Sequence, residues 1–393
     1  MKLFGIMRIL FNASNVAATG PTVLLKQMVP AIAQMDPSSK FHLLLPTSAR
    51  VSDWSLPSNV TCEQIYRASI PEISRLWDLH IRLPHIARAG NYDAVVTLGD
   101  LGPIHLPMPH LIYLHQPYYV YSVPELSTAL SSPQRLKLWY QRRHFCRSVQ
   151  YACKLVVQTP VVGQRAMVAC DIPESKVVVV RPSLPFDVSK LRADPARSFP
   201  LLGGYEGKKL TLLFLAAHYG HKNHIILPSV AEEIRRRALQ DGVHIFVTLD
   251  GSRSSAEKAL LQRLGQYPDV ITNLGILTHA ASIDALGSAG ALFLPTLVET
   301  LGLPYLEAMV LQKPILTSDL DFAHYVCGQE ALYFDPHNAR SIVDKIEELM
   351  ADYSKWKQHV KMGAAEQLAV VSQNVDDMAR EFNAQITASV LGK

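Results

Sequence analysis

Two glutamates stand eight residues apart in the largely apolar segment LPTLVETLGLPYLEAM, residues 294–309. Proline is favoured in the first turn of a helix, so Pro304 marks a possible helix start. We therefore expect Glu299 in a loop and Glu307 in the first turn of that helix. Gly302 lets the backbone approach a ligand closely, and the free amides of a helix start attract anions. The pattern is therefore typical of a phosphate-binding site flanked by two carboxylates that accept hydrogen bonds from hydroxyl groups.

A sugar nucleotide presents this combination of groups, because its diphosphate lies between ribose and hexose hydroxyls. The spacing alone leaves two alternatives open. Glu307 could do no more than complement a helix dipole, with Glu299 a solvated loop residue. The two acids could also form a glycosidase pair, which would have to flank a single glycosidic bond.

Two further residues lie where an apolar strand pattern ends. Lys222 follows the strand in LFLAAHYGHKNHIILP, and a lysine at a helix entry can neutralise phosphate charge. His115 follows the strand in LIYLHQP, and a histidine there can hydrogen-bond sugar hydroxyls or polarise a reacting group. An ordinary surface lysine and an ordinary strand-end histidine are the alternatives.

Short apolar strands alternate with helical patterns along the whole chain, which indicates an α/β architecture with parallel sheets. Ligands in open α/β sheets bind at the carboxyl ends of the strands, so two doubly wound domains would present a cleft between those ends. The predicted strands lie within residues 7–14, 41–46, 93–99, 110–117, 154–159, 176–182, 210–217, 243–251, 270–277, 291–296, 314–318 and 331–336.

A chain of 393 residues is long for one domain and comfortable for two. The segment 183–209 is rich in proline, glycine and charge, which is typical of a linker. We predict an N-terminal Rossmann-like domain over residues 1–190, a linker over 191–209, a C-terminal Rossmann-like domain over 210–370 and a helical segment over 371–393. The sequence leaves open which domain the last segment packs on.

The segment around the two glutamates resembles the donor-site signature of the retaining glycosyltransferases of family 4, which have the GT-B fold. The shared pattern is a strand, Pro-Thr, Glu, seven residues and Glu, and the continuation EAMVLQKPILTSDLDFAHYVCGQEALYFDP is similar to that family's C-terminal domain. The resemblance implies that Glu299 contacts the donor sugar and that Glu307 holds the nucleotide ribose. The backbone that meets the diphosphate would be that of Thr300, Leu301, Gly302 and Leu303.

The resemblance also implies a phosphate contact for Lys222 and a donor-sugar contact for His115. Gly20, ahead of the first helical pattern, is similar to that family's glycine-rich loop. The chain departs from the family where an arginine usually precedes the lysine, because Ala217 and His218 occupy that neighbourhood. Part of the usual positive charge is therefore missing, or a nearby histidine supplies it, of which the candidates are His218, His221 and His224.

The implied function is retaining transfer of a hexose, with mannose as one candidate, from a GDP- or UDP-linked donor to a glycan or lipid-linked acceptor. No cofactor or metal is implied. His115, Glu299 and Lys222 would be the catalytic residues of a front-face mechanism, in which Lys222 and the helix-start amides stabilise the departing phosphate. Bacterial surface-polysaccharide assembly is the usual setting of such transferases. A nucleotide-sugar epimerase, a phosphorylase and a non-catalytic sugar-nucleotide-binding protein are the alternatives.

Residues 131–154 carry six cations and no acid, interleaved with Trp139, Tyr140 and Phe145. Peripheral contact with anionic lipid at the inner membrane face and an ordinary solvated basic helix are both compatible with this pattern. Nucleic acid is not an expected partner, because the net charge is only +4 and the aromatic residues also serve packing.

Other features bear on metal binding and on the compartment. Asp319 and Asp321 form a DxD pair, which holds a metal in other glycosyltransferases, but here we expect a helix cap or loop. Thr159 is predicted to cap a helix.

The five cysteines contain no CxxC pair, which argues against a disulfide framework or a zinc site and favours a reducing cytoplasm. Arg8 interrupts the apolar start, which favours a buried first strand over a signal peptide.

Overall fold

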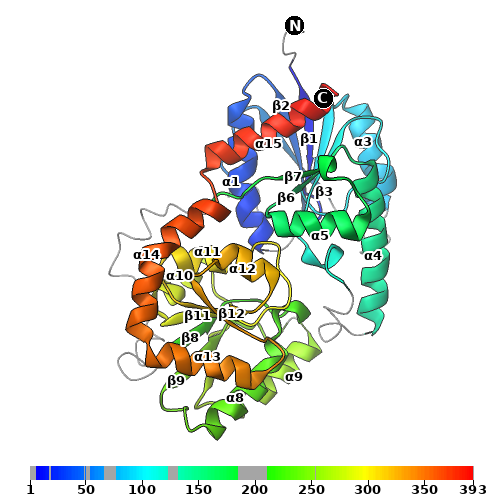
Figure 1. Cartoon of the computed structure of the whole chain (residues 1–393). Coiled ribbons are helices and arrows are strands. Elements are labelled where there is room, and N and C mark those ends of the chain that lie inside the picture. Colours follow the sequence, from blue (N-terminus) through cyan, green and yellow to red (C-terminus); the bar gives the residue numbers. More distant parts are fainter. Residues whose placement is uncertain are drawn as a thin grey trace. The chain divides into compact units, whose positions relative to one another are not determined.

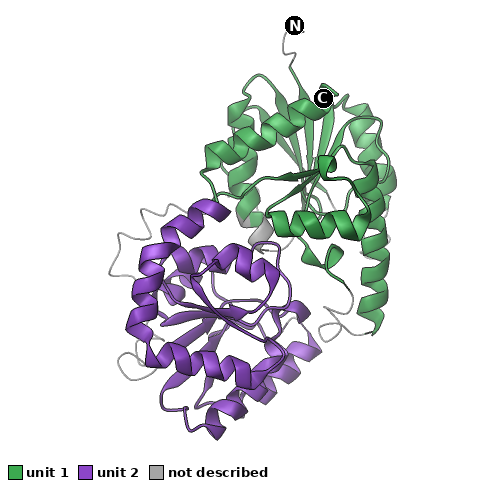
Figure 2. Ribbon diagram, viewed as in Figure 1, with its two compact units in different colours: residues 1–123, 131–185, 372–393 green, residues 124–130, 186–371 purple. Residues whose placement is uncertain are grey.

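Figure 1 shows a computed structural model of the chain, which describes residues 6–16, 19–47, 49, 54–65, 77–122, 132–184, 210–252 and 254–392. The chain divides into two compact units, coloured separately in Figure 2. Unit 1 comprises residues 1–123, 131–185 and 372–393, and unit 2 comprises residues 124–130 and 186–371. Each unit is built around one parallel sheet with crossover helices, which confirms the predicted α/β class with two Rossmann-like domains.

The sheet of unit 1 has the strand order β3-β2-β1-β4-β5-β6-β7 among the described residues. The order reverses between β1 and β4, which is the switch point of a doubly wound sheet. The strands are β1 (Arg8–Asn12), β2 (Lys40–Pro46), β3 (Val60–Ile65), β4 (Ala94–Thr97), β5 (His110–Tyr113), β6 (Lys154–Val157) and β7 (Val177–Val179).

The start of helix α5 in unit 1 agrees with the prediction that Thr159 caps a helix. Thr159 caps the start of α5, where its hydroxyl accepts a hydrogen bond from the Val162 N–H at 3.3 Å, as predicted. The helical elements are α1 (Thr19–Met35), η2 (Asp78–Arg82), α3 (Leu83–Ala89), η3 (Pro117–Tyr119), α4 (Ser132–Tyr151), α5 (Pro160–Cys170), η5 (Glu174–Lys176) and α15 (Val375–Val390).

The sheet of unit 2 has the order β10-β9-β8-β11-β12-β13, with its switch point between β8 and β11. β9, β11 and β12 are buried along their whole length, as is typical of parallel strands with helices on both faces of the sheet. The strands are β8 (Leu210–Phe214), β9 (Val243–Val247), β10 (Ile271–Asn273), β11 (Ala291–Leu294), β12 (Ile315–Ser318) and β13 (Ala331–Phe334). The helical elements are η6 (Gly220–Lys222), η7 (His224–Ile226), α8 (Leu227–Arg236), α9 (Ser255–Leu264), α10 (His279–Ser288), α11 (Leu303–Val310), α12 (Asp321–Cys327), α13 (Ala339–Ala351) and α14 (Tyr353–Val371).

The last helix, α15, returns to unit 1 after α14 ends in unit 2 (Figure 1). Its Phe382 and Ile386 are fully buried in the unit 1 core, and the Phe382 ring lies 5.7 Å from the Tyr113 ring. The Gln373 N–H donates to the Pro182 carbonyl at 3.1 Å just before the helix begins. Residues 185–209, which contain the predicted linker, lie outside the described part of the chain.

Cys146 of α4 and Cys170 of α5 form a disulfide, which corrects the expectation that the cysteines would not pair. The two residues are 24 positions apart and match no local motif, so only the packing of α4 against α5 brings them together. Cys62, Cys153 and Cys327 are not disulfide-bonded. Within the described residues, no helix combines the length and the apolar character that crossing a membrane would require.

Candidate functional site

The loops that follow β8 and β11 carry the central pair of the candidate site. These strands are neighbours at the switch point of the unit 2 sheet, so their carboxyl ends lie side by side. Lys222 ends η6 after β8, and its Nζ forms an ion pair with Glu299 Oε1 in the loop after β11. The two side chains are only 17% and 9% exposed. The structure thus brings into direct contact two residues that the sequence analysis treated separately.

Backbone and hydroxyl contacts hold the two loops together. The Leu297 N–H donates to the His221 carbonyl at 2.7 Å. The Thr296 hydroxyl lies 3.1 Å from both that carbonyl and Glu299 Oε1. Asn223, in the left-handed conformation at φ 60°, donates from Nδ2 to the Pro336 carbonyl at 2.8 Å. Lys222 and Glu299 are therefore fixed by their neighbours before any ligand arrives.

Glu307 lies one turn deeper in α11 than the sequence analysis expected. The helix begins at Leu303, with Pro304 in its first two positions, so Glu307 is the fifth residue and opens the second turn. Its side chain is buried and receives a hydrogen bond from His279 Nε2, the first residue of α10, at 3.0 Å. The Glu307 carboxylate raises the pKa of His279. The sequence analysis missed His279, because no spacing along the chain links residue 279 to residue 307.

Gly302 caps α11 in the left-handed region, at φ 77°. A Cβ at this position would lie 2.6 Å from the Tyr305 ring, so glycine is required by the conformation and by the space. At the start of α11 the Leu303 N–H has no acceptor within the helix. Pro304 carries no N–H, and the Tyr305 N–H donates to the Gly302 carbonyl at 3.0 Å. Thr300 and Leu301 are buried and Leu303 is half-buried.

Three histidines surround Lys222, and their environments differ. Burial lowers the pKa of His224 to about 3 and that of His221 well below 6.5, so both rings are neutral at pH 7. The His224 ring stacks on Phe214 at 4.1 Å. His218 is half-buried, and its ring lies 5.8 Å from the His224 ring. Of the three candidates for the missing arginine charge, His218 is the one that is not held in the interior.

His115 lies in unit 1, in the short turn between β5 and η3. The backbone N–H groups of His115 and Gln116 both donate to Asp100 Oδ1, which fixes the loop at the carboxyl end of the sheet. Burial lowers the pKa of His115 to about 4, so the ring is neutral at pH 7. Asp100 was missed by the sequence analysis, although the Gly-Asp step after β4 marks a turn.

Gly20 is the second residue of α1 rather than part of the loop before it, because the helix begins at Thr19. Residues 17–18 of that loop lie outside the described part of the chain. Gly20 and His115 belong to unit 1, and the other candidate residues belong to unit 2. The cleft expected between the two domains stays a prediction.

The DxD pair has local partners. Asp321 begins α12, and its Oδ1 accepts a hydrogen bond from the Phe322 N–H at 2.8 Å. Asp319 Oδ1 lies 2.6 Å from His324 Nε2. Across the described residues, no group of three or more His, Cys, Asp and Glu side chains is arranged to hold a metal ion.

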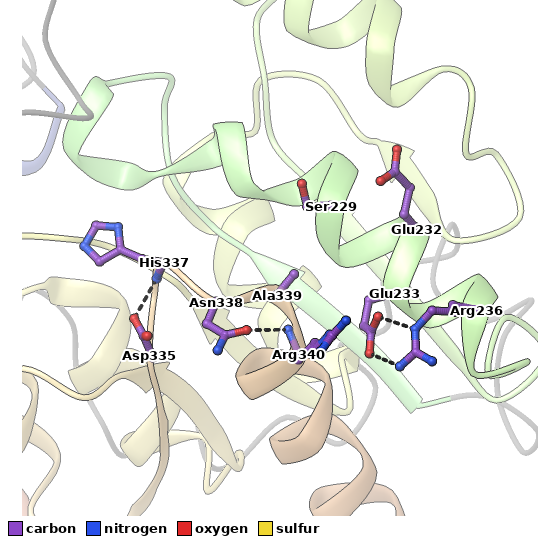
Figure 3. Close-up of a pocket in the computed structure, with 9 residues that line it drawn as sticks. All are labelled: Ser229, Glu232, Glu233, Arg236, Asp335, His337, Asn338, Ala339 and Arg340. Atoms are coloured by element: carbon purple, nitrogen blue, oxygen red, sulfur yellow. Dashed lines mark hydrogen bonds and ion pairs between the residues drawn. The ribbon is translucent and has the colours of Figure 1, made fainter.

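A separate hollow in unit 2 contains none of the candidate residues (Figure 3). It lies between α8 and the turn from β13 to α13. Glu233 accepts from Arg236 at 2.7 and 2.6 Å, and Asn338 caps α13 by accepting from the Arg340 N–H at 3.0 Å. Because these polar groups form hydrogen bonds with one another and cap the start of α13, we do not assign the binding of a sugar donor to this hollow.

In the comparison with known proteins, one family model matches part of the second unit. Residues 203–367 match the family model of glycosyl transferases group 1, and this range contains Lys222, Glu299 and Glu307. No curated protein matches the chain in sequence.

Solved structures match the chain over nearly its whole length. The Anabaena protein HepE in complex with UDP-glucose has a TM-score of 0.71 and 14% identity, covering 98% of this chain and 100% of that one. Sucrose-phosphate synthase from Thermosynechococcus elongatus has a TM-score of 0.71 and 14% identity, covering 98% and 99%. WaaG, a glycosyltransferase involved in lipopolysaccharide biosynthesis, has a TM-score of 0.68 and 14% identity, covering 96% and 99%. The match of residues 203–367 to this family model, in a chain with the fold of GT-B glycosyltransferases, indicates a transferase enzyme.

Proposed function

We propose that the protein transfers a hexose from a nucleotide-diphosphate sugar to a glycan or lipid-linked acceptor, with retention of the anomeric configuration. The observation that carries this proposal is the Lys222–Glu299 pair in the loops after the central strands β8 and β11, in the same loop as Gly302 at the start of α11. A cation and helix-start amides suit a diphosphate, and a carboxylate suits sugar hydroxyls.

The proposed roles follow from what each group can donate or accept. Lys222 and the backbone N–H groups that lead into α11, up to that of Leu303, bind the diphosphate and stabilise the charge that develops on it when the bond to the sugar carbon breaks. Glu299 accepts hydrogen bonds from donor-sugar hydroxyls, and Glu307 accepts them from the ribose. In the front-face mechanism the acceptor hydroxyl attacks on the side that the phosphate leaves, and its proton passes to the leaving phosphate oxygen.

His115 would contact the donor sugar as a neutral ring, because burial keeps its pKa at about 4. A neutral imidazole carries one donor and one acceptor nitrogen, so it can bind a hydroxyl group without adding charge. Gly20 would provide a backbone approach to the donor or acceptor.

The donor candidates are UDP-linked and GDP-linked hexoses. UDP-glucose is favoured by the HepE complex, and GDP-mannose is the second candidate. A setting in surface-polysaccharide assembly is supported by the similarity to WaaG, which is involved in lipopolysaccharide biosynthesis.

A thermal-shift panel of UDP-, GDP-, ADP- and dTDP-sugars tests the donor seat. One nucleotide series should raise Tm, because a ligand at about 100 times its Kd adds about 2.7 kcal/mol to the free energy of unfolding. Glu307→Ala should abolish that shift, and a matched exposed variant, Glu366→Ala in α14, should keep it. The absence of a shift with every donor would contradict the proposed function.

Chelation tests the metal-independent part of the proposal. Donor consumption in the presence of an acceptor should be the same with and without EDTA. Strong inhibition would contradict metal independence and would make Asp319 and Asp321 the first candidates to test as metal ligands.

A non-catalytic sugar-nucleotide-binding protein is the second candidate. It is favoured by Ala217 near the position of the missing arginine, and by the neutrality of His221 and His224, which do not replace its charge. A donor that raises Tm but is never consumed with any acceptor would support this candidate.

A further inference from the structure

Helix α4 turns an unusual face to solvent. Leu136, Trp139, Tyr140 and Tyr151 are 69%, 55%, 51% and 56% exposed, although large apolar and aromatic side chains usually pack inward. Arg143 and Arg147 are exposed among them. We call these six residues the α4 outer face.

The spacing of these residues places them on one side of the helix. Positions 136, 140, 143, 147 and 151 follow one another at steps of three and four, and position 139 lies beside them. The face spans about 22 Å along the axis, at 1.5 Å per residue. The opposite side buries Leu138, Phe145 and Val149 in unit 1, so the helix has a separate apolar side for its core.

The disulfide from Cys146 to Cys170 and the packing on η3 and α5 hold α4 in this orientation. The Arg142 Nη1 donates to the Tyr121 carbonyl at 3.0 Å, which fastens the helix near its middle. The α4 outer face is therefore presented by a fixed helix. Of its six side chains, Tyr151 also packs edge-on against the His105 ring at 4.1 Å.

The charge of the helix has a single sign. α4 contains five cations and no acidic residue. Arg143 lies over the Trp139 ring at 5.9 Å, so a cation and an aromatic ring reach solvent together. In α15 of the same unit, by contrast, acidic residues accompany the one arginine. The face thus combines apolar contact area with positive charge.

We propose that the α4 outer face docks on the surface of an anionic phospholipid bilayer. Tryptophan and tyrosine favour the membrane–water interface, where an apolar ring and a polar tip are both satisfied. Arginine side chains at that level are attracted to the negative surface potential. This inference does not depend on the donor chemistry.

Co-sedimentation of the full chain with vesicles tests the docking. Vesicles containing phosphatidylglycerol should bind the protein, and vesicles of phosphatidylcholine alone should bind it much less. Arg143→Gln with Arg147→Gln should weaken binding by about 25-fold, since each cation near an anionic surface contributes about fivefold. This difference should shrink at high salt, where the charges are screened.

Trp139→Ala with Tyr140→Ala should weaken binding at both low and high salt, because salt does not screen apolar contact. Matched controls lie outside the face: Arg380→Gln in α15 and Met362→Ala in α14, at positions whose side chains are also exposed. Both controls should bind vesicles like the unmodified protein. An unchanged Tm should show that all variants are folded.

Three results would overturn the proposal. The first is equal binding to both kinds of vesicle, or none. The second is vesicle binding that both double variants retain in full. The third is a dimer seen by analytical ultracentrifugation that Trp139→Ala with Tyr140→Ala dissociates, because the face would then join two copies of this chain.

Discussion

Lys222 and Glu299 form an ion pair that is largely shielded from water. When one partner of such a pair is removed, the other charge remains buried without compensation. The pair therefore couples the local stability of two loops to the proposed binding of a diphosphate. A variant that loses donor affinity through misfolding must be distinguished from one that loses it through the lost charge.

Lys222→Met should lower the free energy of unfolding by about 1–3 kcal/mol, because Glu299 keeps its charge and loses its cation. Adding Glu299→Gln should recover most of that loss without restoring donor affinity. Denaturant unfolding and donor titration of both proteins measure the two effects. Equal loss of affinity for the nucleotide-diphosphate sugar and for the bare nucleoside would contradict a specific role for Lys222.

Glu299→Gln by itself should abolish transfer while leaving the affinity for the bare nucleotide nearly unchanged. The reason is that the proposed contact of Glu299 is to the donor sugar. Turnover and nucleotide titration, measured on the same preparation, check this prediction. Full activity of the variant would remove Glu299 from the donor site.

The hydrogen bond between His279 and Glu307 predicts a pH dependence of stability. Glu307 raises the pKa of His279 above its unfolded value of 6.5, so the folded state holds the proton more tightly. This contribution is fully present below pH 6.5 and is lost as the pH rises through the folded pKa. The free energy of unfolding, measured across this interval, should fall with pH, and His279→Asn should flatten that part of the curve.

At the scale of the element, the start of α11 depends on Gly302. Its φ is 77°, and a Cβ added there would lie 2.6 Å from the Tyr305 ring, which leaves no room for a side chain. Gly302→Ala should therefore lower the free energy of unfolding by about 1–3 kcal/mol, the usual cost of such backbone strain. Denaturant unfolding measures the change.

Gly287 in α10 is the matched control for this prediction. Nothing lies within 4 Å of a Cβ at Gly287, and the residue lies inside a helix. Gly287→Ala should raise the free energy of unfolding by about 0.5–1 kcal/mol, because alanine is the better helix former. If both alanine variants changed stability in the same direction, the strain argument for Gly302 would be wrong.

Strands could be predicted from the sequence where they are buried on both faces of the sheet. The apolar runs ALFL of β11 and LTLLF of β8 predict those strands. β3 is not among the predicted strands, because it lies at the sheet edge and its VTCEQI mixes buried and exposed positions. The predicted helix starts were less exact than the strands. α11 begins at Leu303, one residue before the proline taken as its start, so Glu307 lies in the second turn and not in the first.

At the scale of the whole molecule, α15 connects the end of the chain to the core of unit 1. Phe382→Ala should lower the stability of unit 1 by about 3–5 kcal/mol, the usual cost of removing a fully buried phenylalanine side chain. Hydrogen exchange should show the loss of protection in β1, β4 and β5 and not in the unit 2 sheet. Val370→Ala in α14, whose side chain is half exposed, should change little.

The sequence by itself determined the fold class and the described strands other than β3, because periodicity and turn chemistry are local properties. It also singled out Lys222, Glu299, Gly302 and Glu307 as candidates, through a local motif that resembles a known family. Only the tertiary structure decided that Lys222 pairs with Glu299 and that His279 holds Glu307. It also decided that Cys146 bonds to Cys170 and that α15 packs on unit 1. Each of these contacts joins residues far apart in the chain, and sheet order and helix packing, which no local pattern encodes, bring them together.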